Sequence, residues 1–235
     1  NKYTFMILNV KNETSRLKSV VLGMPNSMGQ PHSLEDSYDA KSYHSLQNGI
    51  YPSESDIVYE MTEFEKVLKK YDVEVYRPSL IKDYNQVFAR DVAFVIDDQM
   101  IISNIIEDRY DEQDAFRKIF ARVGWKKIIN LPETAHIEGG DVIPWNDFIF
   151  IGTSYDRDYR SFKTARTNEY AIEILKEYFP KKRIIDLDLK KSDTDPYSGI
   201  LHLDCTFNPI GHDKCIIYKE GFVDESDYRL LLDIF

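Results

Sequence analysis

The stretch His136-Ile137-Glu138-Gly139-Gly140-Asp141-Val142-Ile143-Pro144 decides the fold, because here polar residues lead into an apolar strand and begin a pattern that is repeated. A polar turn at Asn146-Asp147 separates it from a second apolar run at Phe148–Gly152, which predicts two strands joined by a tight turn. A helix is expected near Thr167–Tyr178 and a further strand at Arg183–Leu189. The segment therefore predicts a ββαβ unit.

Strand, helix and strand signals recur along the chain at intervals of very roughly 50–60 residues, as in a repeat protein. The first unit is predicted to have strands at Ser19–Met24 and Val73–Arg77, with a helix near Asp56–Tyr71. The second unit is predicted to have strands at Val87–Val95, Met100–Ile105 and Lys127–Leu131, with a helix near Glu112–Val123. The fourth unit is predicted to have strands at Leu201–Phe207 and Cys215–Tyr218 and a helix near Glu225–Ile234. The fourth unit has no strand after its helix, so the repeat is expected to be incomplete at its C-terminal end. The sequence thus predicts an α/β protein in which residues 1–235 form a single domain of ββαβ repeats.

The composition of the chain limits its class. Its 235 residues and 43% hydrophobic content are enough for one sizeable core. The 40 acidic and 30 basic residues give a net charge of -10, which disfavours binding to nucleic acid or to an anionic membrane and suits a small cationic substrate. The same charge is also explained by solubility alone.

Signals for a membrane, a cofactor or a metal are weak. No run approaches the roughly 20 apolar residues of a membrane span, and Asn1–Lys11 does not resemble a leader sequence, so a cytoplasmic protein is expected. The only cysteines, Cys205 and Cys215, are expected to stay reduced rather than to form a disulfide across a hairpin. Gly139-Gly140 is not followed by a phosphate-binding pattern, and no His or Cys spacing is typical of a metal site, so no cofactor and no metal are expected.

The polar stretch Pro25–Pro52 is long for a loop inside one domain. Its Gly, Ser, Asn and His residues suit a lid or substrate loop that covers a site. They suit equally well a mobile excursion on the surface.

Four short motifs place polar residues near the starts of strand-like runs, namely Phe88–Asp91, His136–Asp141, Ala165–Asn168 and His202–Asp204. Together they offer several carboxylates and one histidine at corresponding places in successive units. Because two carboxylates can clamp the forked N–H groups of a planar guanidinium, the motifs predict a site for a guanidinium cation.

The residues around His202 are expected to form a strand. In a strand, His202, Asp204 and Thr206 would share one face, and Cys205 would point to the other. An imidazole beside a carboxylate suits proton transfer near neutral pH. His202 is therefore a candidate for chemistry, and Cys205 is not expected to be a nucleophile.

Two of the motifs also have explanations that need no function. Gly139-Gly140, between Glu138 and Asp141, suits the close approach of a ligand, or equally a turn flanked by solvated acids. Arg90-Asp91 suits a surface ion pair, although the apolar strand that follows places Asp91 at a strand entrance as well.

Five segments, in the same order along nearly the whole chain, resemble the guanidino-group-modifying enzymes, which are the amidinotransferases, arginine deiminases and dimethylarginine hydrolases. They are Glu13–Lys18, Asn85–Asp91, His136–Asp141, Arg166–Asn168 and His202–Gly211. The last of them looks most like the amidinotransferase branch. The resemblance implies the five-bladed α/β-propeller, or pentein, fold, with about four of the five repeats present in this chain.

In such enzymes a cysteine thiolate attacks the guanidinium carbon, and the covalent amidino-thioether then reacts with water or with an amine. The resemblance implies that His202 is the general acid and base and that Glu138 orients it or grips the guanidinium. The candidate substrate-binding residues are Asp91, Asp204, Asp141, Arg166 and Asn85. Among them, Arg166 is implied to meet a substrate carboxylate. The expected partner is a small guanidino substrate such as arginine.

The sequence departs from the family in one respect. The nucleophilic cysteine of the family lies near the C-terminus, in the last blade, and this sequence has no such residue before Phe235. The 235 residues are therefore expected to be nearly inactive and to be part of a longer natural protein. Hydrolysis, as in a deiminase, and a guanidinium-binding protein without catalysis stay open as alternatives to an amidinotransferase. Homo-oligomer formation through exposed apolar surface is also open.

Overall fold

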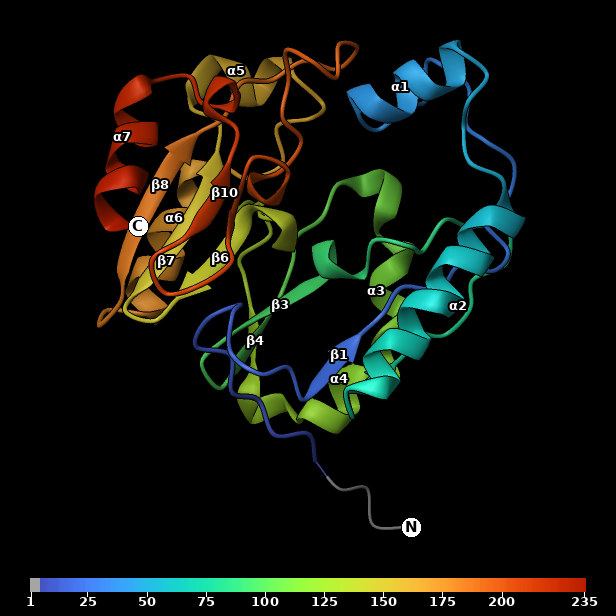
Figure 1. Cartoon of the computed structure of the whole chain (residues 1–235), viewed down its shortest axis with the longest axis horizontal. Coiled ribbons are helices and arrows are strands. Elements are labelled where there is room, and N and C mark those ends of the chain that lie inside the picture. The colour runs from blue at the N-terminus through green and yellow to red at the C-terminus, as the bar shows by residue number, and fades with distance from the viewer. Residues whose placement is uncertain (1–4) are drawn as a thin grey trace.

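The computed structural model describes residues 5–235, except for the side chains of residues 156–158. The strands are β1 (Ser19–Val21), β2 (Glu74–Tyr76), β3 (Ala93–Ile96), β4 (Gln99–Ile102), β5 (Ile128–Asn130), β6 (Val142–Trp145), β7 (Phe148–Thr153), β8 (Arg183–Asp188), β9 (Phe207–Pro209) and β10 (Cys215–Ile217). The helices are α1 (Ala40–Gln47), α2 (Glu54–Lys70), α3 (Asp111–Ala115), α4 (Arg117–Val123), α5 (Asp156–Ser161), α6 (Glu169–Tyr178) and α7 (Glu225–Ile234). Figure 1 shows β1 and α2 on one side of the molecule and the strands β6 to β8, with α6 and α7, on the other.

The second and third units have the predicted ββαβ arrangement. In each, two antiparallel strands form a hairpin, and the strand after the helix pairs parallel with the second hairpin strand, giving the orders β3-β4-β5 and β6-β7-β8. The hairpins turn at Asp97 and Asn146, whose φ angles of 51° and 54° are tolerated by Asp and Asn in tight turns. Local turn chemistry therefore sets the register of both hairpins.

The first and fourth units have two-stranded sheets, in which β1 is parallel to β2 and β9 is antiparallel to β10. Within the described part of the chain the strands thus form four separate sheets. The α/β class is confirmed. Closure of such sheets into a five-bladed propeller stays a prediction.

The long helices begin at side-chain caps that the sequence supplies. Ser53 accepts a hydrogen bond from the backbone N–H of Asp56 at the start of α2, and Asn168 accepts one from Ala171 at the start of α6. Helix α7 spans the predicted residues Glu225–Ile234. These caps satisfy backbone N–H groups that have no partner inside a helix, and so they fix where each helix starts.

Three predictions about helices were wrong. The stretch Pro25–Pro52 is not a plain loop, because it contains α1, whose short polar sequence gives no apolar periodicity. The segment between β7 and α6, for which no helix was predicted, contains α5. The helix expected near Glu112–Val123 is two helices, because at Phe116 the backbone N–H bonds to the carbonyl of Gln113, three residues back, instead of four.

The sheet β6-β7-β8 is covered on both faces, which makes it the centre of the core. Ile149 and Ile151 of β7 pack in a cluster with Leu175 of α6. Phe150, between them in the strand, belongs to a second cluster and meets the ring of Phe207 at 5.2 Å between centroids. Successive β7 side chains point to opposite faces, so one strand joins the third unit to the fourth.

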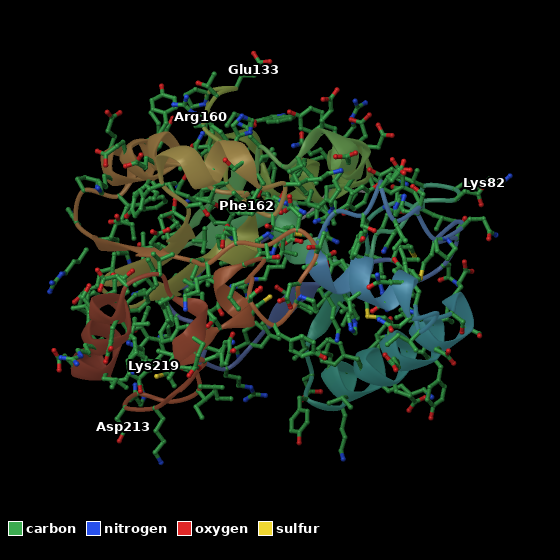
Figure 2. The ribbon with its side chains drawn as sticks, turned by 90° about the horizontal axis from the view of Figure 1, so that it is seen from above. Lys82, Glu133, Arg160, Phe162, Asp213 and Lys219 are labelled. Carbon is green, nitrogen blue, oxygen red and sulfur yellow. The ribbon has the colours of Figure 1, made fainter. Side chains whose placement is uncertain are left out.

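The surface is charged. Figure 2 shows Lys82, Glu133 and Asp213 projecting outward from the rim of the molecule, as expected for solvated side chains. No helix in the part of the chain that the structure describes is both long enough and apolar enough to span a membrane.

Candidate active site

Three short 3₁₀ turns bring the predicted motifs together. They are Ala89–Asp91, Gly139–Asp141 and Leu203–Cys205, and each lies just before the first strand of its unit, β3, β6 or β9. The turn Gly139–Asp141, which we call the diglycine turn, contacts both of the others. Three of the four motifs therefore meet at strand entrances, as predicted, whereas Ala165–Asn168 leads into the helix α6 and not into a strand.

The strand predicted for Leu201–Phe207 was wrong. Leu203–Cys205 forms the 3₁₀ turn, and β9 begins only at Phe207, so the side chains do not alternate between two faces. The side-chain carboxylate of Asp141 accepts a hydrogen bond from the backbone N–H of Leu203 at 3.0 Å, which stabilises the turn. Thr206 is buried and donates its hydroxyl to the carbonyl of Tyr218 at 2.7 Å, so it does not share a face with His202.

The diglycine lets the turns approach one another closely. A Cβ atom on Gly140 would lie 2.6 Å from Nδ1 of His202 and 2.9 Å from Oδ1 of Asp91, and one on Gly139 would lie 1.9 Å from the carbonyl oxygen of Arg90. Contacts this short are sterically excluded. Because Glu138 and Asp141 are buried, the diglycine is not a turn between solvated acids, and in this structure it allows the close packing of the motifs. The close approach of a ligand stays a prediction.

His202 lies between two buried carboxylates. Its Nε2 is 2.8 Å from Oε2 of Glu138, and its Nδ1 is 3.6 Å from Oδ1 of Asp91. Burial by itself lowers the pKa of His202, but the carboxylates of Asp91, Glu138 and Asp141 outweigh it and raise the pKa to about 9. The imidazole is therefore protonated at neutral pH and can act as a proton donor.

We expect the free energy of unfolding to fall by about 3 kcal/mol as the pH rises through the pKa of His202. The folded pKa of about 9 is above the ordinary histidine pKa of 6.5, so the stabilisation is fully present below pH 6.5 and is lost as the pH rises through about 9. Urea denaturation of the wild type and of His202→Gln, from about pH 6 to about pH 10, measures it. A constant stability difference between the two proteins over this range would contradict the assignment.

Arg166 lies beside Glu138. Its Nη1 donates to both carboxylate oxygens of Glu138, at 3.1 and 2.9 Å, and its Nη2 donates to the carbonyl of Tyr38 at 2.6 Å. Burial raises the pKa of Glu138, but Arg166 and His202 lower it well below its ordinary value. With the backbone N–H of Ile106 on Oε1, at 3.1 Å, Glu138 accepts four hydrogen bonds, two on each oxygen.

Sequence reasoning missed Arg109 and Glu112, which complete the buried network. Arg109 donates to Oδ2 of Asp91 at 2.7 Å and to both oxygens of Glu112 at 2.6 and 3.0 Å. Burial raises the pKa of Glu112 despite the opposing effect of Arg109. The spacing of three residues between Arg109 and Glu112 was the available signal, but it is also typical of an exposed pair on a helix.

Asp204 is the most accessible of these acids. Its side chain is 27% exposed, and its Oδ2 lies 3.2 Å from Nε of Arg90. Burial raises the pKa of Asp204, and Arg90 acts in the opposite direction. Arg90 and Asp91 do not pair with each other in these contacts, because Asp91 faces Arg109 and His202.

Two predicted substrate-binding residues lie differently. Asp141 is buried, and its carboxylate accepts hydrogen bonds from Thr167 at 2.6 Å and from the backbone of Leu203, which suits a structural role. Asn85 lies on a separate hollow, which it lines together with Tyr51 and the start of α2. A larger cavity of about 290 Å³ lies at the start of α6, and none of the predicted site residues lines it.

The same cluster also contains residue types that can ligate a metal ion. Asp91, Glu138 and His202 each offer one ligand atom, and these atoms lie within 4.8 Å of one another. A metal ion would need open carboxylate lone pairs, whereas here Asp91 binds Arg109 and Glu138 binds Arg166. The donor set therefore suits a proton-transfer site better than a metal.

Neither cysteine has the properties of a nucleophile. Both are free thiols, and Cys215 pairs with Pro209 across the hairpin rather than with Cys205. Desolvation of the thiolate and the carboxylate of Asp204 raise the pKa of Cys205 to about 12. At neutral pH Cys205 is a thiol, which attacks carbon far more slowly than a thiolate.

Comparison with known proteins gives consistent matches. Residues 65–232 match the sequence model of the arginine deiminase family. An uncharacterized protein of Bacillus subtilis (strain 168), YkgA, is 27% identical over 220 residues, which are 92% of this chain and 68% of that protein.

Two solved structures have a similar fold. SxtG, an amidinotransferase of the saxitoxin biosynthetic pathway of Microseira wollei, superposes with a TM-score of 0.72 at 20% identity, over 97% of this chain and 74% of its own. The N-terminal domain of ArgZ, an arginine dihydrolase of cyanobacteria, superposes with a TM-score of 0.71 at 16% identity, over 92% of this chain and 72% of its own. Because the family match covers more than half of the sequence, this chain belongs to the arginine deiminase family, within the pentein superfamily of guanidino-modifying proteins.

Proposed function

We propose that this protein modifies the guanidino group of arginine or a related guanidine, and that it does so as an amidinotransferase. The observation that carries the proposal is the protonated, buried His202 held between Asp91 and Glu138, with the half-buried Asp204 close by in sequence. A protonated imidazole can give a proton to a leaving amine, and the acids suit a cationic substrate.

The number of hydrogen bonds that each carboxylate already accepts indicates its role. Glu138 already accepts two hydrogen bonds on each oxygen. We therefore assign Glu138 to orienting the imidazole of His202 and keeping it protonated, and not to binding the substrate. Among the contacts of the described residues, Oδ1 of Asp91 and the carboxylate of Asp204 keep unused acceptor capacity. Asp91 and Asp204 are therefore the residues that we assign to the substrate guanidinium.

Arg166 has a different role from the one implied by resemblance. It donates to Glu138, to Tyr38 and, through Nε at 2.8 Å, to the carbonyl of Lys163. These contacts use most of its five N–H groups. We assign Arg166 to keeping Glu138 ionised and not to a substrate carboxylate.

In the proposed reaction a thiolate attacks the guanidinium carbon, and the bond from that carbon to the leaving nitrogen breaks. His202 donates its Nδ1 proton to the leaving amine, which leaves an amidino-thioether and a neutral imidazole. The imidazole then takes a proton from the attacking water or amine, and the thiolate is released. Cys205 and Cys215 do not suit the role of thiolate, so we place the nucleophile outside these 235 residues.

Hydrolysis is the second candidate, because the matching family model is that of arginine deiminase. Water and an amine can react with the same intermediate, and the choice between them depends on access to the site. The product therefore has to be measured.

Mass spectrometry of the products from arginine, with and without glycine, tests the proposal on the protein encoded by the complete gene. A transferase is expected to form ornithine and a guanidine derived from glycine only when glycine is present. Citrulline in both samples would show a hydrolase instead. No product from arginine in either sample would contradict arginine as the substrate.

The same assay tests the role of His202. His202→Ala is expected to lower turnover by about 10²–10⁴-fold, because it removes the proton donor. His212→Ala, a change at an exposed loop histidine, is the matched control and should leave turnover unchanged. Equal turnover in the two variants would sink the assignment of His202.

A further inference from the structure

Arg90 connects three parts of the candidate site. Its Nε donates to the carbonyl of Gly139 at 3.2 Å and lies 3.2 Å from Oδ2 of Asp204. Its Nη2 donates to the carbonyl of Val142 at 2.9 Å and to the carboxylate of Glu13 at 2.7 Å. One guanidinium thus joins the diglycine turn, the turn after His202 and the N-terminal segment.

Asp204 depends on this contact more than the other acids depend on theirs. Glu138 is held by three groups and Asp91 by two, whereas among the described residues the Asp204 carboxylate contacts Arg90 and, at 3.7 Å, the weak donor Sγ of Cys205. Asp204 sits in a single 3₁₀ turn, which does not by itself fix the direction of its side chain.

Arg90 differs from the other two arginines of the cluster. The side chains of Arg109 and Arg166 are 9% and 1% exposed, while that of Arg90 is 39% exposed. Its two carbonyl contacts fix its Nε and Nη2 to the backbone that carries Glu138, so its planar fork has a defined direction. The position of the diglycine turn therefore determines where the guanidinium of Arg90 lies, and with it the carboxylate of Asp204.

We propose that Arg90 is a positioning residue that holds the Asp204 carboxylate toward the substrate guanidinium, an inference that rests on the proposed function. A lysine at this position would keep the charge, but its single ammonium lacks the fork that reaches Asp204 and both carbonyls. Charge and orientation can therefore be separated by experiment.

The test is the binding of L-arginine by calorimetry, together with the pKa of Asp204 from NMR of side-chain carboxyl carbons. Arg90→Gln is expected to raise the pKa of Asp204 and to weaken arginine binding about 10-fold or more. Arg90→Lys should keep the pKa of Asp204 close to that of the wild type and restore only part of the affinity. Arg77→Gln is the matched control, because Arg77 binds Glu65 and the carbonyl of Gly23 away from the site.

A double-mutant cycle separates positioning from general stability. In the Asp204→Asn background, Arg90→Gln should cause little further loss of arginine affinity, because the two residues act as one unit. Additive losses, or an unchanged pKa of Asp204 in Arg90→Gln, would overturn the inference about Arg90. If the wild type binds no arginine, the proposed function fails, while the pKa of Asp204 still decides whether Arg90 holds it. If Arg90→Gln does not fold, the cycle is measured with Arg90→Lys, whose partial loss of arginine affinity should disappear in the Asp204→Asn background.

Discussion

Replacing Glu138 with Ala is expected to lower the free energy of unfolding by about 3–5 kcal/mol, since removal of one partner leaves buried charges uncompensated. Glu138 is fully buried and faces both Arg166 and His202. After its removal, two buried cations would lose their shared anion, and the backbone N–H of Ile106 would lose its acceptor. Urea denaturation at about pH 7 measures the change.

Glu65→Ala provides the control for this prediction. Glu65 also binds an arginine, Arg77, as well as Lys69, but its side chain is 24% exposed. Because solvent screens such a pair, its loss should cost about 1 kcal/mol or less. If both substitutions destabilise the protein equally, burial of the Glu138 network is not the source of the effect.

Gly140→Ala is expected to destabilise the protein by about 1–3 kcal/mol and to separate His202 from Asp91. The added Cβ would lie 2.6 Å from Nδ1 and 2.7 Å from Cγ of His202, so the ring has to move. Since the ring is held by Glu138 at Nε2, movement weakens the contacts that keep the imidazole charged. The pKa of His202, followed by NMR of its ring carbons, should therefore fall from about 9 toward 6.5.

Gly211→Ala controls for the loss of a glycine. The nearest atom to a Cβ at Gly211 is Cβ of Lys214, at 3.8 Å, which is an ordinary contact. This variant should keep both the stability and the pKa of His202. A Gly140→Ala protein with the same pKa and stability as Gly211→Ala would show that the site has room that the structure does not indicate.

Much of the fold could be predicted because its signals are local. Asp97 and Asn146 mark the hairpin turns, and the apolar spacing in Glu225–Ile234 defines α7. The predicted strand at Leu201–Phe207 failed because a 3₁₀ turn and a strand start can have the same polar and apolar pattern. In this case a tertiary contact, from Asp141 to the N–H of Leu203, decided the local structure.

The sequence by itself determined the repeated α/β units, the order of the motifs and the choice of His202 and its acids as the candidate site. These features depend on residue types at short spacings, which a single chain displays directly. Only the tertiary structure decided which groups pair: His202 with Glu138, 64 residues away, Asp91 with Arg109, and Asp204 with Arg90. The reason is physical, because the charge of a buried group depends on neighbours brought together by packing, and no local pattern encodes those neighbours.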